Sequence, residues 1–198
     1  MLDINTIRKD FPILDQKVNG QKLIYFDNAA TSQTPNQVVN SIVDYYQRTN
    51  SNIHRGNHKL SIQATTAYED VRKKLQKYFN SRLPQEIIFT SGTTQSINII
   101  TLGYTDILTS QDEVIVSEME HHSNIVPIQM LCERTGAKLN VIPMDNQGNL
   151  IMEEFDKFLS EKTKLVFVSH VSNALGTVNP ISYIINKSHE VGAKVLID

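Results

Sequence analysis

Several clusters of polar residues follow short apolar runs and carry side chains suited to a flat, anionic ligand. In the segment 90–94, Gly92 lets backbone approach a ligand closely, and the hydroxyls of Thr93 and Thr94 add hydrogen-bond donors. Free N–H groups at the start of a following helix would complete an anion site. An ordinary helix N-cap is the alternative interpretation. The segment matches neither the P-loop pattern nor the dinucleotide fingerprint, which disfavours ATP and dinucleotides.

A second cluster, residues 117–124, contains the adjacent histidines His121 and His122. Imidazoles at a strand end can stack on a planar ligand or bind metal. We disfavour metal because neighbouring side chains usually diverge and no Cys or carboxylate spacing supports a site. A solvated or core pair of histidines is the alternative interpretation.

Two further polar residues follow later apolar runs. Asn173 comes after the run 164–169 and has an amide that could bond a ligand hydroxyl, although a turn-forming Asn before glycine is the alternative. Asp198 follows three apolar residues, and a buried carboxylate needs a partner such as a protonated pyridine nitrogen. A merely solvated carboxylate is the alternative there.

The elements that must position these residues alternate along the second half of the chain. Apolar runs predict strands at 86–90, 113–117, 138–142, 164–169 and 194–198. Periodic apolar residues predict helices at 94–102, 124–134, 152–159 and 180–191. This alternation indicates an α/β fold with a mostly parallel sheet and crossover helices. Ligands of such sheets lie at the carboxyl ends of the strands, where the polar clusters occur.

The first part of the chain has a different pattern. We expect a short helix at 6–11 and a strand or extended arm at 23–26. Apolar residues three and four positions apart predict longer helices at 35–48 and 61–79.

Composition limits the classes of function. The chain has 198 residues, 40% hydrophobic and 20% charged, with a net charge of -2, so it has no broad attraction to nucleic acid or acidic membranes. Its single cysteine, Cys132, lies on the apolar face of a predicted helix, which favours a small buried hydrophobe over a nucleophile. We see neither a signal peptide nor a run of about 18 apolar residues, and we expect a cytoplasmic protein.

Taken together, the motifs resemble the Suf-type cysteine desulfurases, which belong to the class V aminotransferase family of pyridoxal-phosphate (PLP) enzymes. The residues that carry the resemblance are 25–31, 54–56, 91–94, 119–127, 170–176 and 193–198. The resemblance implies the large domain of a fold type I PLP-dependent transferase.

The resemblance also implies roles for single residues. Thr93 and Thr94 would hold the cofactor phosphate, and His121 would stack on the pyridine ring as a catalytic residue. Asn173 would bond the phenolic oxygen, and Asp198 would pair with the ring nitrogen and keep the ring an electron sink. A second set would lie near the substrate entrance or subunit boundary: Asn28, Ala29, His54 and Arg55.

The activity implied is conversion of L-cysteine to L-alanine, with persulfide sulfur passed to an acceptor protein for iron–sulfur cluster assembly, by a homodimer. Residues 1–198 would be an N-terminal arm and a truncated large domain. The rest of that domain and a C-terminal small domain would be absent. The lysine that binds PLP covalently, the sulfur-accepting cysteine and a substrate-binding arginine would follow Asp198. We therefore expect this chain alone to be inactive.

Two alternatives remain open at this point. One is a non-catalytic module or fragment that retains the fold. The other is a different class V PLP enzyme, such as a selenocysteine lyase.

Overall fold

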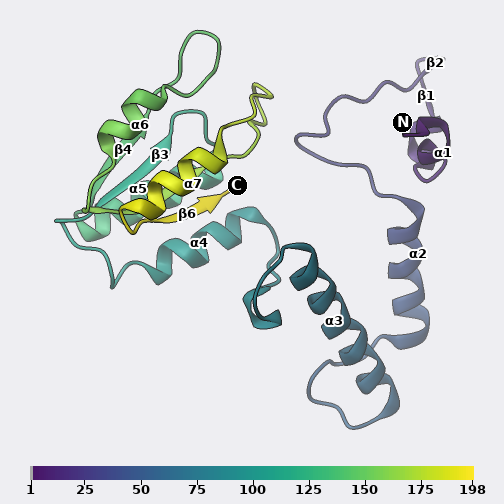
Figure 1. The fold of residues 1–198 in the computed structure, drawn as a ribbon. Coiled ribbons are helices and arrows are strands. Elements are labelled where there is room, and N and C mark those ends of the chain that lie inside the picture. The colour runs from purple at the N-terminus through teal and green to yellow at the C-terminus, as the bar shows by residue number, and fades with distance from the viewer. Residues whose placement is uncertain (1) are drawn as a thin grey trace. The chain divides into compact units, whose positions relative to one another are not determined.

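The computed structural model describes residues 2–198, and the chain divides into two compact units at Phe89/Thr90. The second unit, Thr90–Asp198, is built on one sheet of four parallel strands in the order β4-β3-β5-β6 (Figure 1). The strands are β3 (Glu113–Ser117), β4 (Lys138–Ile142), β5 (Thr163–Val168) and β6 (Lys194–Ile197).

Helices cover both faces of this sheet, because β3 and β5 have apolar side chains on both sides. The helices of the unit are α4 (Thr93–Gly103), α5 (His122–Thr135), α6 (Met152–Phe158) and α7 (Ile181–Glu190). One core cluster joins Val114 and Val116 of β3 to α5, and the other joins Ile115 to α6 and α7. Since neighbouring residues of a strand point to opposite faces, β3 lies between two helical layers.

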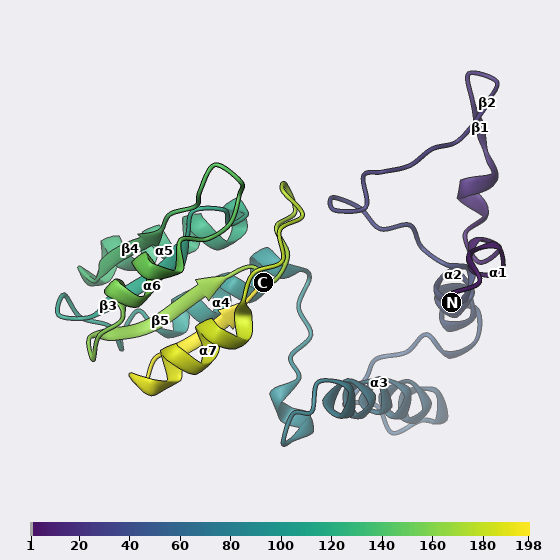
Figure 2. The same ribbon diagram turned by 45° about the horizontal axis from the view of Figure 1, so that its top comes forward.

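The connections reverse direction at the middle of the sheet. From β3 the chain passes through α5 to β4, which lies on one side of the central pair β3 and β5. From β5 it passes through α7 to β6, which lies on the other side of this pair. The carboxyl ends of β3 and β5 therefore flank a topological switch point, the usual ligand position in open α/β sheets. Figure 2 shows β5 beside the end of the chain.

The first unit, which ends at Phe89, is mainly helical. It contains α1 (Ile4–Arg8), α2 (Asn36–Asp44) and α3 (Lys59–Tyr78). Its shorter elements are η1 (Pro12–Asp15), the antiparallel pair β1 (Lys17–Val18) and β2 (Gln21–Lys22), η2 (Tyr45–Thr49) and η3 (Pro84–Glu86). Among residues 2–198, no helix combines the length and apolar character that crossing a membrane requires.

The later elements agree with the sequence predictions to within two residues, but the early ones differ. The predicted strand 86–90 is wrong: Pro84–Glu86 is a 3₁₀ turn, and residues 87–90 have no strand to pair with in the described part of the chain. A strand needs a hydrogen-bonding neighbour, which an apolar run alone does not supply. Residues 23–26 form no strand either and fit the extended-arm alternative.

The bounds of two early helices also differ from prediction. The first helix begins at Ile4 rather than residue 6, because the Asp3 carboxylate accepts a hydrogen bond from the Thr6 amide at 3.2 Å. The regular part of α2 ends at Asp44 and continues as a wider π-type turn, η2.

Phe155 of α6 tests the contribution of the second core cluster, because it is fully buried there. We expect Phe155→Ala to lower the free energy of unfolding by about 3 to 5 kcal/mol, since the change removes apolar contacts and leaves a cavity. Urea denaturation followed by circular dichroism measures this change. Phe79→Ala is the matched control at a 63% exposed site, with an expected loss within about 0.5 kcal/mol. Equal losses in the two variants would contradict the assignment of this core.

Candidate functional site

The carboxyl ends of β3, β5 and β6 bring three of the predicted site residues to one edge of the sheet. His121 lies between β3 and α5, and Asn173 lies in the loop after β5. Asp198 directly follows β6: its amide donates to the carbonyl oxygen of Val168 at 3.0 Å, and its own carbonyl oxygen accepts from the His170 amide at 2.7 Å. Backbone pairing thus places Asp198 beside the end of β5.

The start of α4 has the features of an anion site. Gly92 has φ 156° and ψ 173°, a conformation essentially limited to glycine. Within the described part of the chain no side chain caps α4, so the N–H groups of its first turn are open to a ligand. Thr93 and Thr94 form that turn and are exposed. Figure 1 and Figure 2 both show this end of α4 on the same side of the unit as the carboxyl end of β6.

His121 is exposed and caps α5. Its Nδ1 accepts a hydrogen bond from the Ser123 amide at 3.2 Å and lies 2.8 Å from the Ser123 hydroxyl. An accepting Nδ1 places the proton of the neutral ring on Nε2. The ring packs edge-on against His122, with centroids 5.8 Å apart. In residues 2–198 we find no group of three or more His, Cys, Asp or Glu side chains that could hold a metal ion.

Asn173 is exposed in a loop held by its own backbone. The Ser172 amide donates to the Thr177 carbonyl oxygen at 2.9 Å, and the Gly176 amide donates to the Ser172 carbonyl oxygen at 2.9 Å. These backbone bonds do not use the Asn173 side chain, which is exposed and can meet a ligand, and they also fit the turn-forming alternative.

Beneath these residues lies a buried polar network that the sequence analysis did not assign. Glu120, Asn124, Ser169 and Asn179 are all buried and linked by hydrogen bonds. The only sequence signal was the occurrence of polar residues beside apolar strand ends. Three buried atoms of this network have no partner among residues 2–198: Asn124 Oδ1, Ser169 Oγ and Asn179 Oδ1. Such atoms are uncommon in folded proteins, and they fit an edge that meets a polar ligand or ordered water.

The four predicted substrate residues belong to the first unit, and the five predicted cofactor residues belong to the second. Asn28 and Ala29 are exposed in a turn in which the Asp27 carbonyl oxygen accepts from the Thr31 amide at 3.0 Å. The Tyr25 hydroxyl closes this turn by donating to the Thr31 carbonyl oxygen at 2.6 Å.

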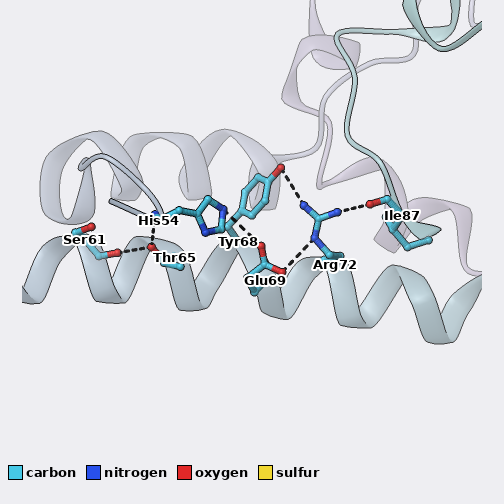
Figure 3. Close-up of polar contacts among 7 residues, drawn as sticks. All are labelled: His54, Ser61, Thr65, Tyr68, Glu69, Arg72 and Ile87. Atoms are coloured by element: carbon cyan, nitrogen blue, oxygen red, sulfur yellow. Dashed lines mark hydrogen bonds and ion pairs between the residues drawn. The ribbon is translucent and has the colours of Figure 1, made fainter. Parts of the chain in front are cut away.

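His54 and Arg55 lie in a loop anchored to α3 (Figure 3). The His54 amide donates to Thr65 Oγ1 at 2.9 Å, and Thr65 Oγ1 donates to the Ser61 carbonyl oxygen at 2.8 Å. The anchor holds His54 at φ 65°, the left-handed region that non-glycine residues rarely adopt.

Further side chains of α3 contact His54 and one another. His54 Nε2 lies 3.6 Å from Glu69 Oε1, and Glu69 Oε2 accepts from Arg72 Nε at 3.1 Å. Arg72 also donates to the Ile87 carbonyl oxygen, and its guanidinium lies 5.3 Å from the Tyr68 ring centroid. The loop that carries Arg55 is therefore fixed from one side by a row of α3 residues.

Thr65 tests this anchor. We expect Thr65→Val to lower the free energy of unfolding by about 1 kcal/mol, because the isosteric valine side chain cannot accept a hydrogen bond from the His54 amide. Amide hydrogen exchange should also become faster at His54. Thr66→Val, at an exposed neighbouring site, is the control. Unchanged exchange at His54 in the Thr65 variant would contradict the anchor.

Cys132 lies buried in the core cluster on α5, as predicted. Burial raises the pKa of the Cys132 thiol from its ordinary value of 9.0 to about 11, because desolvation disfavours the thiolate. A nucleophile needs exposure and a stabilised thiolate. Cys132 therefore has the properties of a packing residue.

Alkylation by iodoacetamide checks this conclusion. At pH 8 we expect the folded chain to react at least about a hundredfold more slowly than the urea-unfolded chain, because a pKa raised from 9.0 to about 11 lowers the thiolate fraction by that factor. Equal rates would show that Cys132 is accessible and ionised in the fold.

Known proteins resemble this chain over nearly its whole length. The profile of the family described as aminotransferase class-V matches residues 24–198. A probable cysteine desulfurase of Synechocystis sp. is 50% identical over 194 residues, which are 98% of this chain and 46% of that protein. A probable cysteine desulfurase of Halalkalibacterium halodurans is 46% identical over 198 residues, or 100% of this chain and 49% of that protein.

Solved structures give the same picture. An apo cysteine desulfurase from Thermococcus onnurineus NA1 superposes with a TM-score of 0.91 and 37% identity, over 100% of this chain and 48% of that one. A cysteine desulfurase from Escherichia coli has a TM-score of 0.83 and 28% identity, over 100% of this chain and 49% of that one. The chain thus spans about half the length of the relatives it matches.

Proposed function

The chain belongs to the aminotransferase class-V family, and we propose that it is the cofactor-binding portion of a PLP-dependent cysteine desulfurase. The observation that carries the proposal is the second unit's sheet edge, where the start of α4, which no side chain of residues 2–198 caps, lies on the same side as the end of β6 that Asp198 follows. The similarity to cysteine desulfurases over the whole chain supports it.

The chemistry of the edge fits PLP. The cofactor is flat, anionic at its phosphate and basic at its ring nitrogen. Thr93 and Thr94 would bind the phosphate with the open N–H groups of α4. His121, whose ring orientation is set by Ser123, would stack on the pyridine ring. The three buried atoms beneath the edge that lack a partner within residues 2–198 also fit a site for a polar ligand.

Two further residues would set the orientation of the cofactor ring and the protonation of its nitrogen. The Asn173 amide would donate to the phenolic oxygen and orient the ring. The Asp198 carboxylate would hold a proton on the ring nitrogen, because an opposite charge favours the protonated form. When bound, PLP supplies an electron sink for the substrate's α-carbon.

For the whole protein we propose conversion of L-cysteine to L-alanine, with sulfur passed as a persulfide to an acceptor protein in iron–sulfur cluster assembly. We propose that residues 1–198 are an N-terminal arm and part of the large domain, and that the protein works as a homodimer. Asn28, Ala29, His54 and Arg55 would lie near the substrate entrance or subunit boundary. A cytoplasmic location stays a prediction of the sequence.

A PLP titration of the purified 198-residue chain tests the proposal. We expect saturable, non-covalent binding, measured by absorbance, with no lysine adduct after borohydride treatment. Thr94→Val and Asp198→Asn should each weaken binding about tenfold, the effect of one charge-assisted hydrogen bond. Thr66→Val serves as the control for a threonine outside the site.

Competition between inorganic phosphate and PLP is a second measurement in this experiment. Phosphate should compete with PLP for the wild-type chain, because both use the start of α4. Absence of PLP binding, or only scattered adducts on surface lysines, would favour a non-catalytic module that retains the fold.

A further inference from the structure

A buried carboxylate with no part in the proposed cofactor contacts joins the ends of the two central strands. Glu120 lies between β3 and α5, directly before His121, and is 7% exposed. We propose that Glu120 is a positioning residue that holds His121 and the Asn173 loop, residues 169–179, at a fixed separation. The inference rests on the proposed function and adds a residue to it.

Three donors from three separate segments converge on this carboxylate. Oε1 accepts from the Ser117 hydroxyl at the end of β3 and from the Ser169 amide after β5, the latter at 2.8 Å. Oε2 accepts from Asn124 Nδ2 in the first turn of α5 at 2.7 Å. A single side chain therefore links both sides of the switch point to the helix that His121 caps.

Across residues 2–198 none of the ion pairs includes Glu120, so neutral donors and the positive end of the α5 dipole offset the burial of its carboxylate. If the acceptor is removed, the Ser169 amide and the Asn124 amide group are left buried without a partner, which is costly. The arrangement thus depends on this one side chain.

The link extends from Ser169 to the base of the Asn173 loop. Asn179 Nδ2 donates to the Ser169 carbonyl oxygen at 2.8 Å, and the Asn179 amide donates to the His170 carbonyl oxygen at 2.9 Å. Val171 and Val178 form an antiparallel bridge just inside this base. Because Glu120 holds Ser169, it holds the end of the loop from which Asn173 projects.

Two conservative variants separate the effect of the length of the Glu120 side chain from the effect of its charge. In Glu120→Gln, the amide oxygen can still accept from Ser117 and Ser169. Its new NH₂ group faces Asn124 Nδ2, but Asn124 Oδ1 has no partner among residues 2–198, so reversal of the Asn124 amide restores the bond. In Glu120→Asp, the charge stays but the side chain is one methylene shorter and cannot reach all three donors.

The first readout is PLP affinity of the 198-residue chain, together with the circular dichroism band of bound PLP. We expect Glu120→Asp to weaken binding about tenfold or more and to alter the band, because His121 and Asn173 move apart. Glu120→Gln should stay within about twofold of wild type. Glu118→Ala is the matched control: it removes the neighbouring exposed carboxylate, which accepts from the Met144 amide at 3.0 Å. It should bind PLP as wild type does.

The second readout needs no cofactor. Amide hydrogen exchange at Ser169 should be slow in wild type and in Glu120→Gln, and at least about tenfold faster in Glu120→Asp, because its acceptor is lost. If wild type binds no PLP, the proposed function is wrong and Ser169 exchange alone decides the role of Glu120. Equal exchange in wild type and Glu120→Asp overturns the inference, as does equal PLP affinity with an unchanged band.

Discussion

The parallel pairing of β3 with β5 is the constraint on which the second unit depends. Val114, Ile115 and Val116 of β3 pair in register with Leu165, Val166 and Phe167 of β5, and these six side chains are buried. Parallel neighbours cannot be joined by a tight turn, so the chain must cross over through helices, and the helices must cover both faces. Because the crossovers run in opposite directions from this pair, its carboxyl end is left open as the candidate site.

Local hydrogen bonds then determine which groups lie at the open carboxyl end of β3 and β5. No side chain in the described part of the chain caps α4, which follows Gly92, whereas α5 is capped by a site residue, His121. One helix start is therefore available to an anion, and the other fixes an imidazole. Asp198 reaches the same edge through ordinary strand pairing with the end of β5. The residues of the candidate site thus come from the ends of helices and strands and from the Asn173 loop.

In the first unit, too, local hydrogen bonds hold residues of the proposed site in place. The loop with His54 and Arg55 is fixed by Thr65 and Glu69 of α3. Hydrogen bonds to a long helix can hold an irregular segment in a strained backbone conformation when several of them act together. In both units, the residues proposed for chemistry are exposed, and the residues that hold them in place are buried or half-buried.

The sequence by itself determined the elements whose signals are local. The strands at 113–117 and 138–142 and the buried character of Cys132 follow from apolar runs and periodicity, and the predicted helix start at residue 94 lies one residue from the observed start at Thr93. The tertiary structure alone decided which runs find a partner: residues 87–89 are apolar, yet no strand among residues 2–198 pairs with them, because pairing depends on distant segments. It also decided the role of Glu120, whose Ser169 donor lies 49 residues away. A contact between residues that far apart leaves no periodic trace in the sequence, so only the folded chain reveals it.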